Sequence, residues 1–107
     1  MVYYIKESNI EGFMNKVQLI NEISMETGLK KTDIESVVNA FMDVVSKALV
    51  SGEKVSLKGF GTFDTFERKA SLGRVVKTGE VVEIPSHYVP RFKASASLKK
   101  KVSEGIE

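Results

Sequence analysis

The apolar residues of this 107-residue chain change their spacing near Gly52. Before that glycine they recur every three or four positions, which is the spacing of helices that pack by one face. After it they alternate with polar residues in short runs bounded by glycine, which is typical of strands. We therefore predict two helices followed by an antiparallel sheet. The run SASLKKKVS near the end adds a short last helix, with Ser95 or Ser97 as its cap.

The first helix is predicted to begin after Asn15, whose side chain can accept a hydrogen bond from the first turn. Gln18, three residues later, can reach back and complete a variant of the capping box. The segment TGLKK then ends the helix at Gly28. The apolar residues Leu19, Ile20 and Ile23 fall on one face of this helix.

Thr32 is predicted to cap the start of the second helix, with Glu35 completing a capping box, and the helix is predicted to end before Gly52. Its apolar residues cover an arc of roughly 160°, wider than the stripe of an ordinary surface helix. The first helix cannot cover that arc alone, so we expect a second subunit to cover the rest. The residues of the arc are Ile34, Val37, Val38, Phe41, Met42, Val44, Val45, Ala48 and Leu49.

Strand signals begin at Val55 and Leu57, which alternate with polar residues as in a half-exposed strand. Gly59 and Gly61 bracket a turn or bulge, and the next strand is expected to begin at Phe63. Further on, HYVPRFKAS is expected to be irregular or a short strand, with Pro85 and Pro90 at irregular edges.

The stretch LGRVVKTGEVVEIP predicts a hairpin with its turn at the Thr78-Gly79 step. The flanking RVV and VVEI have the β-branched content of strands. The inner side chains could pack only against each other, and an isolated two-stranded hairpin is marginal in water. A hairpin edged with arginine and lysine therefore needs another source of stability.

The charged residues are distributed unevenly along the chain. Residues 1–51 carry five basic and seven acidic side chains, whereas residues 54–101 carry eleven basic and four acidic ones. The chain has no cysteine, which excludes disulfides and thiolate metal sites and suits a reducing cytosol. His87 is the one histidine, and we expect a surface or strand-end residue there rather than a ligand. No apolar run is long enough to span a membrane.

Four motifs in this order resemble the HU/IHF family of bacterial histone-like, DNA-bending proteins. They are MNKVQLI from Met14, GFGTF from Gly59, GR..KTGE from Gly73 and IP....PRF....LK from Ile84. The resemblance extends from Asn15 to Val102 without a gap. It implies an α+β fold with an N-terminal helical hairpin, a three-stranded antiparallel sheet carrying an extended β-arm, and a short C-terminal helix. It also implies an intertwined dimer.

By this resemblance, residues 14–107 form the DNA-binding domain, the β-arm covers about residues 66–84, and residues 1–13 are an extension. The expected function is architectural: the arms of a dimer hold double-stranded DNA along its minor groove with low sequence specificity, and so compact or bend it. Membership implies a cytoplasmic, nucleoid-associated protein with no cofactor, no membrane partner and no small-molecule substrate. A homodimer is expected, although the sequence leaves open a different partner chain.

Site residues follow by matching positions. Those expected to contact DNA are Lys16, Arg68, Lys69, Arg74, Val75, Val76, Lys77, Lys93, Lys99 and Lys100, and those expected in the dimer core are Val38, Phe41, Val45, Phe60 and Phe63. The chain departs from the family at the arm tip, where Val75-Val76 replaces an Asn-Pro whose proline wedges between base pairs. Phe66 and Ser71 replace arm arginines, and Ser95-Ala96 replaces a Gly-Lys. These departures predict weaker kinking of DNA.

Two alternatives remain at this point. One is a site-preferring bender of the IHF kind, selected by direct contacts and by DNA deformability. The other is a degenerate family member whose arm adds strands to the sheet of a protein partner. An enzyme is not expected, because the sequence has no pairing of nucleophile and base, no metal cluster and no paired carboxylates at a plausible site.

Overall fold

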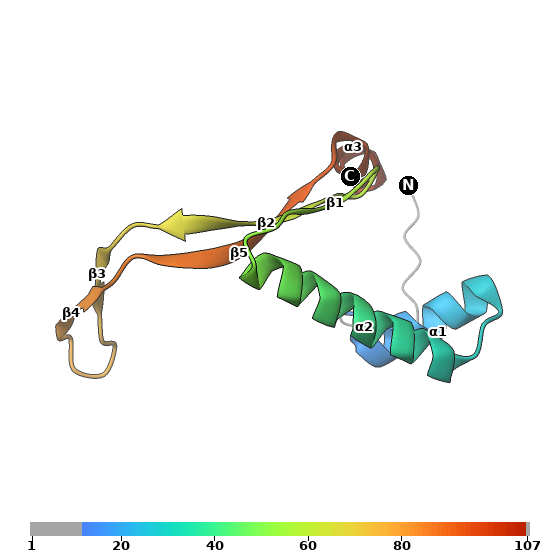
Figure 1. The fold of residues 1–107 in the computed structure, drawn as a ribbon, viewed down its shortest axis with the longest axis horizontal. Coiled ribbons are helices and arrows are strands. Elements are labelled where there is room, and N and C mark those ends of the chain that lie inside the picture. Colours follow the sequence, from blue (N-terminus) through green and yellow to red (C-terminus); the bar gives the residue numbers. More distant parts are fainter. Residues whose placement is uncertain (1–11, 107) are drawn as a thin grey trace. The chain divides into compact units, whose positions relative to one another are not determined.

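The structure, a computed structural model, describes residues 12–106. The elements are α1 (Lys16–Thr27), α2 (Lys31–Val50), β1 (Val55–Leu57), β2 (Gly61–Arg68), β3 (Ser71–Arg74), β4 (Val81–Ile84), β5 (His87–Ala94) and α3 (Ala96–Gly105), drawn in Figure 1. They fall into two units. The first holds α1 and α2 up to residue 46, and the second runs from residue 47 to residue 106. The predicted α+β order of elements is confirmed. The extension expected over residues 1–13 lies outside the described residues except for its last two.

The ends of α1 follow the prediction. The Asn15 side chain accepts a hydrogen bond from the Gln18 backbone at 2.9 Å, and the Gln18 side chain accepts one from the Asn15 backbone at 3.0 Å. At the other end Gly28 has a φ of 75°, a left-handed conformation that glycine adopts without a Cβ clash. Both ends of this helix are therefore set by local chemistry, which is why the sequence alone predicts them.

The start of α2 differs from the prediction by two residues, because a cap at Thr32 places the first helical residue at Asp33. The helix begins at Lys31, so the predicted cap Thr32 lies inside its first turn. The end is as predicted: Gly52 N–H donates to the Leu49 carbonyl and Glu53 N–H donates to the Ala48 carbonyl, both near 3.0 Å. This pair of bonds is the Schellman pattern, and the φ of 80° at Gly52 completes it.

The apolar arc of α2 is only partly covered within the first unit. Ile34 and Val45 are buried, together with Ile20 of α1. On the same helix Val37 is 68% exposed and Phe41 is 44% exposed. Burying such side chains is favourable by roughly 1.5–3 kcal/mol each, so a large amount of stabilisation is left unused on this surface of the single chain.

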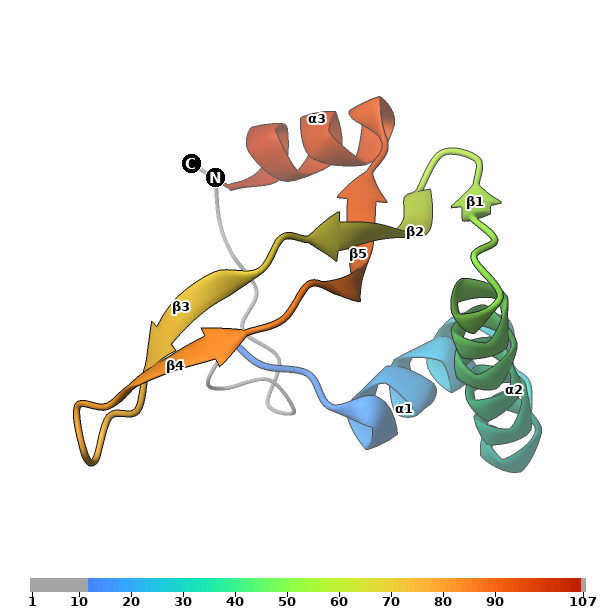
Figure 2. The ribbon, with the colours of Figure 1, turned by 60° about the vertical axis from the view of Figure 1, so that its left-hand side comes forward.

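The second unit is built on a three-stranded antiparallel sheet in the order β1-β2-β5. β2 and β5 pair over their whole length, from Gly61 opposite Ala94 to Arg68 opposite His87. Residues directly opposite each other share a face of the sheet, and successive residues alternate between faces. The sheet therefore has two chemically different faces. α3 follows β5 at one end of this ladder, and the hairpin continues from the other end (Figure 2).

The segment HYVPRFKAS was expected to be irregular or a short strand, and the second alternative is correct, because residues His87–Ala94 form the eight-residue strand β5. Pro90 lies inside that strand, opposite Thr65, and not at an irregular edge. β5 pairs with β2 alone, so its outer edge needs no hydrogen bond from Pro90, which has no N–H to donate. The strand β2 also begins at Gly61, two residues before the predicted start at Phe63.

One face of the sheet, the apolar face, is formed mainly by Val55, Leu57, Phe63 and Phe92. The rings of Phe63 and Phe92 lie 4.9 Å apart between centroids, and Phe60 lies 5.3 Å from Phe92. A Cβ on Gly61 would lie 2.5 Å from the Phe92 ring and 2.5 Å from the Lys93 carbonyl oxygen. The second glycine of the GFGTF motif is therefore required by close packing.

The predicted hairpin is present as β3 and β4, a separate two-stranded sheet (Figures 1 and 2). Its loop is closed by hydrogen bonds from Val75 N–H to the Glu80 carbonyl at 2.8 Å and from Gly79 N–H to the Val75 carbonyl at 2.7 Å. Gly79 has a φ of 72°, in agreement with the turn predicted at Thr78-Gly79. The side chains of the hairpin are exposed, including Leu72 at 75%.

Candidate nucleic-acid interface

The second face of the sheet carries the positive charge. Arg68, Arg91 and Lys93 share it, because Arg68 lies opposite His87, Arg91 opposite Asp64, and Lys93 opposite Thr62. We call the set formed by Thr62, Asp64, Phe66, Arg68, His87, Val89, Arg91 and Lys93 the cationic face. β1 extends this face, since the Thr62 hydroxyl donates a hydrogen bond of 3.2 Å to the Ser56 hydroxyl.

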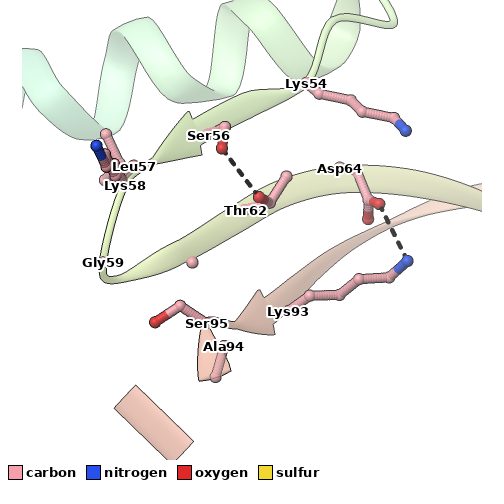
Figure 3. A pocket seen from close by; sticks show the side chains of 11 residues that line it. Lys54, Ser56, Leu57, Lys58, Gly59, Thr62, Asp64, Lys93, Ala94 and Ser95 are labelled. Atoms are coloured by element: carbon pink, nitrogen blue, oxygen red, sulfur yellow. Dashed lines mark hydrogen bonds and ion pairs between the residues drawn. The ribbon is translucent and has the colours of Figure 1, made fainter. Parts of the chain in front are cut away.

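A pocket lies on this face beside β1 (Figure 3). Lys54, Lys58 and Lys93 line it together with the hydroxyl groups of Ser56 and Thr62. In Figure 3 the Lys54 and Lys93 side chains extend along the same side of the sheet as Asp64. Amines and hydroxyl groups are the side chains that proteins most often present to phosphate oxygens, so the pocket is suited to an anionic group.

Asp64 is the one buried charged residue among the described residues, with 3% of its surface exposed. Its carboxylate accepts a bidentate pair of hydrogen bonds from Arg91, Nε to Oδ1 at 2.9 Å and Nη2 to Oδ2 at 3.1 Å. The Lys93 ammonium lies 3.8 Å from the same Oδ2. The Arg91 guanidinium also stacks on the Phe66 ring, with its Cζ 4.8 Å from the ring centroid.

This arrangement shifts the pKa of both partners in the direction that keeps them charged. The hydrogen bond from Arg91 lowers the pKa of Asp64, with further lowering by the positive charges of Arg91, Lys93 and Lys54 and partial opposition from burial. The hydrogen bond to Asp64 raises the pKa of Arg91. One carboxylate thus faces three cations, and this part of the sheet keeps a positive charge.

The hairpin loop presents a different kind of surface. Val76 is 98% exposed and Val75 is 37% exposed. The charged residues Arg74 and Lys77 flank them and are also exposed. The loop therefore offers an apolar tip between two cations, a combination suited to a ligand with phosphates at its edges and stacked bases between which an apolar side chain can insert.

All ten residues predicted to contact DNA are exposed. The structure brings Arg68 and Lys93 onto one face of the sheet, Arg74 to Lys77 together in the hairpin loop, and Lys99 and Lys100 onto α3. Lys16 is the first residue of α1, in the other unit. Of the predicted dimer-core residues, Val45 is buried, Val38 and Phe63 are half-buried, and Phe41 and Phe60 are exposed in the single chain.

Four residues of this site were not among those predicted from the sequence: Lys54, Lys58, Asp64 and Arg91. Asp64 and Arg91 each lie in a run with aromatic residues, in TFDTF and in PRF, which is unusual for charged residues. Only the register of the two strands shows that they lie opposite each other. Within residues 12–106 no group of three or more histidine, cysteine, aspartate or glutamate side chains could hold a metal ion. The same residues contain no helix long and apolar enough to cross a membrane.

A cationic sheet face continued by an arm with exposed side chains defines the class of small proteins that bind polyanions through a β-arm. The sequence model of the family "Bacterial DNA-binding protein" matches residues 14–103. The chain therefore belongs to this family, as the four motifs indicated. Its relatives are named for DNA binding and not for a reaction, in agreement with the expectation that it is not an enzyme.

Individual relatives cover almost the whole of the matched region. DNA-binding protein HU of Lactococcus lactis is 52% identical over 88 residues, which is 82% of this chain and 97% of the relative. DNA-binding protein HU of Geobacillus stearothermophilus is 46% identical over 89 residues, covering 83% and 99%. Among solved structures, an Anabaena HU–DNA cocrystal structure superimposes with a TM-score of 0.79 at 39% identity, covering 84% of this chain and 98% of that one.

Proposed function

We propose that this protein is an architectural double-stranded DNA-binding protein that acts as a dimer and holds the duplex along its minor groove with its β-arms. The observation that carries the proposal is the continuity of the cationic face of the sheet with an exposed, cation-edged hairpin. The Anabaena HU protein, which shares this fold, was crystallised with DNA. The proposed domain is residues 14–107, with its arm at about residues 66–84.

Low sequence specificity follows from the chemistry of the interface. Lysine and arginine neutralise phosphates and release counterions, which gives affinity without reading bases. The minor groove displays little beyond the difference between A·T and G·C pairs. The residues proposed to contact DNA are Lys16, Arg68, Lys69, Arg74, Val75, Val76, Lys77, Lys93, Lys99 and Lys100. We also propose Arg91, Lys54 and Lys58, because Arg91 lies on the cationic face and the two lysines line the pocket beside it. The expected location is the nucleoid.

The proposal includes a dimer because one chain leaves too much apolar surface uncovered. At least 40% of the surface is exposed for three phenylalanines: Phe41 on α2, Phe60 in the turn before β2, and Phe92 in β5. More than 60% is exposed for Val37 and Val44 on α2. A second copy of the chain is the simplest cover, and Val38, Phe41, Val45, Phe60 and Phe63 are its proposed core. Phe41→Ala should then cost about 3–5 kcal/mol of dimer stability.

Sedimentation equilibrium measures the dimer directly, at protein concentrations spanning the micromolar range. Wild type should sediment as a dimer, and Phe41→Ala should shift the equilibrium toward monomer or unfolded chain. A folded wild-type monomer at micromolar concentration would refute the dimer. Mixing tagged and untagged copies of this chain tests whether identical chains assemble.

The DNA-binding proposal is tested by fluorescence anisotropy with a labelled duplex of random sequence at several salt concentrations. The logarithm of the association constant should fall linearly with the logarithm of the salt concentration, with a slope of about −0.9 for each neutralised phosphate. A second duplex of scrambled sequence should give nearly the same constants. A strong preference for one sequence would favour the site-preferring alternative instead.

The strand-adding alternative predicts a different salt dependence. Both strands of the β3–β4 sheet have an unpaired edge that a protein partner could use. Backbone hydrogen bonds between strands are nearly independent of salt, whereas phosphate contacts are not. This alternative would be favoured if a protein partner stayed bound to the hairpin at high salt and the protein showed no measurable DNA binding at low salt.

A further inference from the structure

His87 is the first residue of β5 and lies directly opposite Arg68, at the point where the sheet gives way to the hairpin. Directly opposed residues point to the same side of the sheet, so His87 belongs to the cationic face. Its side chain is exposed. His87 is the one histidine of the chain.

The ring of His87 is held in one orientation by a short contact. Its Nδ1 lies 3.0 Å from the Pro85 carbonyl oxygen. A carbonyl oxygen only accepts hydrogen bonds, so Nδ1 must carry a hydrogen and donate it. In the neutral ring Nε2 then has no hydrogen and presents a lone pair. In the protonated ring Nε2 becomes a donor with a positive charge, while the bond to Pro85 is kept.

We propose that His87 is a further DNA contact, which binds a backbone phosphate through Nε2 only when the imidazole is protonated. This inference rests on the proposed DNA-binding function and adds a proton-dependent cation to it. A neutral Nε2 repels a phosphate oxygen, since both carry lone pairs. A protonated Nε2 makes a charge-assisted hydrogen bond to the same oxygen, which is among the stronger contacts available at an interface.

Two charged residues of β2 lie near His87, one on each face of the sheet. β2 is the strand paired with β5, and it places Arg68 on the same face as His87. Glu67 projects from the other face, where its carboxylate accepts a hydrogen bond of 3.1 Å from the Ser86 hydroxyl. A phosphate bound on this face would pair with the permanent charge of Arg68 and with the protonated imidazole of His87.

The test is a pair of DNA titrations by fluorescence anisotropy, with a labelled random-sequence duplex, at about pH 7.5 and about pH 5.5, the range over which imidazoles gain charge. Wild type should bind roughly three- to tenfold more tightly at the lower pH. The salt slope should also steepen by about one for each histidine engaged. Asp64 stays ionised in this range because its pKa lies below the ordinary value of 3.8.

Two variants separate the histidine from other effects of pH. His87→Gln keeps a polar side chain without the proton, and its affinity should be equal at both pH values. His87→Lys carries a permanent charge, and it should bind at the higher pH about as tightly as wild type does at the lower. Circular dichroism at both pH values checks that each variant is folded.

The outcomes are distinguishable from failure of the general proposal. If wild type binds DNA with a steep salt dependence but with equal affinity at both pH values, the role of His87 is refuted and the DNA-binding function stands. The same holds if His87→Gln keeps the full pH dependence. If wild type binds no DNA at either pH, the proposed function itself fails.

Discussion

The β2–β5 ladder and the β3–β4 hairpin follow each other along the same two chain segments, yet they are held together differently. In the ladder Phe63 stacks near Phe92 on one face, and Asp64 pairs with Arg91 on the other. In the hairpin Leu72, Val81 and Val82 are exposed, at 75%, 54% and 39%. The hairpin is held together by backbone hydrogen bonds between its strands and by the loop that is closed at Gly79.

This difference assigns separate tasks to the two regions. A ladder with side chains packed on both faces keeps its shape before and after binding. A hairpin without a core has little to lose by changing shape, so in the proposed complex we expect contacts with DNA to complete its order. The sheet thus provides a fixed cationic platform, and the arm provides an adaptable extension.

Between the ladder and the hairpin, the largest expected effect comes from truncating an aromatic ring in the ladder. Phe92→Ala removes the contacts with both Phe60 and Phe63 and should cost about 2–3 kcal/mol of unfolding free energy. The matched change in the hairpin, Val82→Ala, should cost less than about 0.5 kcal/mol. Denaturant unfolding at one fixed protein concentration measures both. Equal costs would show that the hairpin has a core of its own.

A glycine pair gives the second comparison. Gly61→Ala places a methyl group against the Phe92 ring and the rigid Lys93 carbonyl, and should cost about 1–3 kcal/mol. Gly73→Ala places a methyl group 2.7 Å from the Ile84 Cδ1, which is the end of a side chain that can turn away. This substitution should therefore change the unfolding free energy by less than about 0.5 kcal/mol. Thermal unfolding of the two variants tests this. A hairpin as rigid as the ladder would give similar losses.

Arg74→Ala should affect binding and leave folding unchanged, because Arg74 lies at the end of the coreless hairpin. We expect weaker binding to all DNA sequences by a similar factor, and a salt slope shallower by about one. Lys30→Ala, which removes a cation outside the proposed interface, is the control. A loss confined to certain sequences would indicate base readout by the arm.

The smallest change in affinity is expected for Val76→Pro. Inserting a side chain into DNA unstacks a base step at a cost of a few kcal/mol, which contacts to the bent duplex must offset. Valine is apolar but lacks the flat ring of proline, so wild type should bend DNA less than the variant does. Affinity for straight duplex should be nearly the same for both proteins. Energy transfer across a short duplex labelled at both ends measures the bend, and equal bends would show that valine wedges as well as proline.

Features set by neighbours in the sequence could be predicted. The capping box at Asn15, the glycine that ends α2, the loop at Gly79 and the Ser95 cap of α3 each depend on residues within a few positions. The ten expected contact residues were all located on the surface, because charge and pattern alone decide exposure for most of them.

Features set by distant pairing could not be predicted. The ion pair between Asp64 and Arg91 joins residues 27 positions apart, and one residue of register shift would move them to opposite faces. The sequence left open whether residues 87–94 form a strand, because a proline usually interrupts one, and only the sheet order shows that β5 has a free edge. The requirement for glycine at position 61 likewise depends on the ring of Phe92, which is distant in the sequence and adjacent in the sheet.

The open edges of the hairpin also bear on solubility. A short sheet with two unpaired edges and exposed valine, leucine and isoleucine is a template for pairing with further copies of itself. Arg74 and Glu83 place charges on the two strands, Lys77 and Glu80 place charges in the loop, and such charges keep like chains apart. High salt screens them at the same time as it releases nucleic acid. Preparations stripped of DNA at high ionic strength should therefore aggregate through their arms, and a bound duplex should act as the cover that keeps them dispersed.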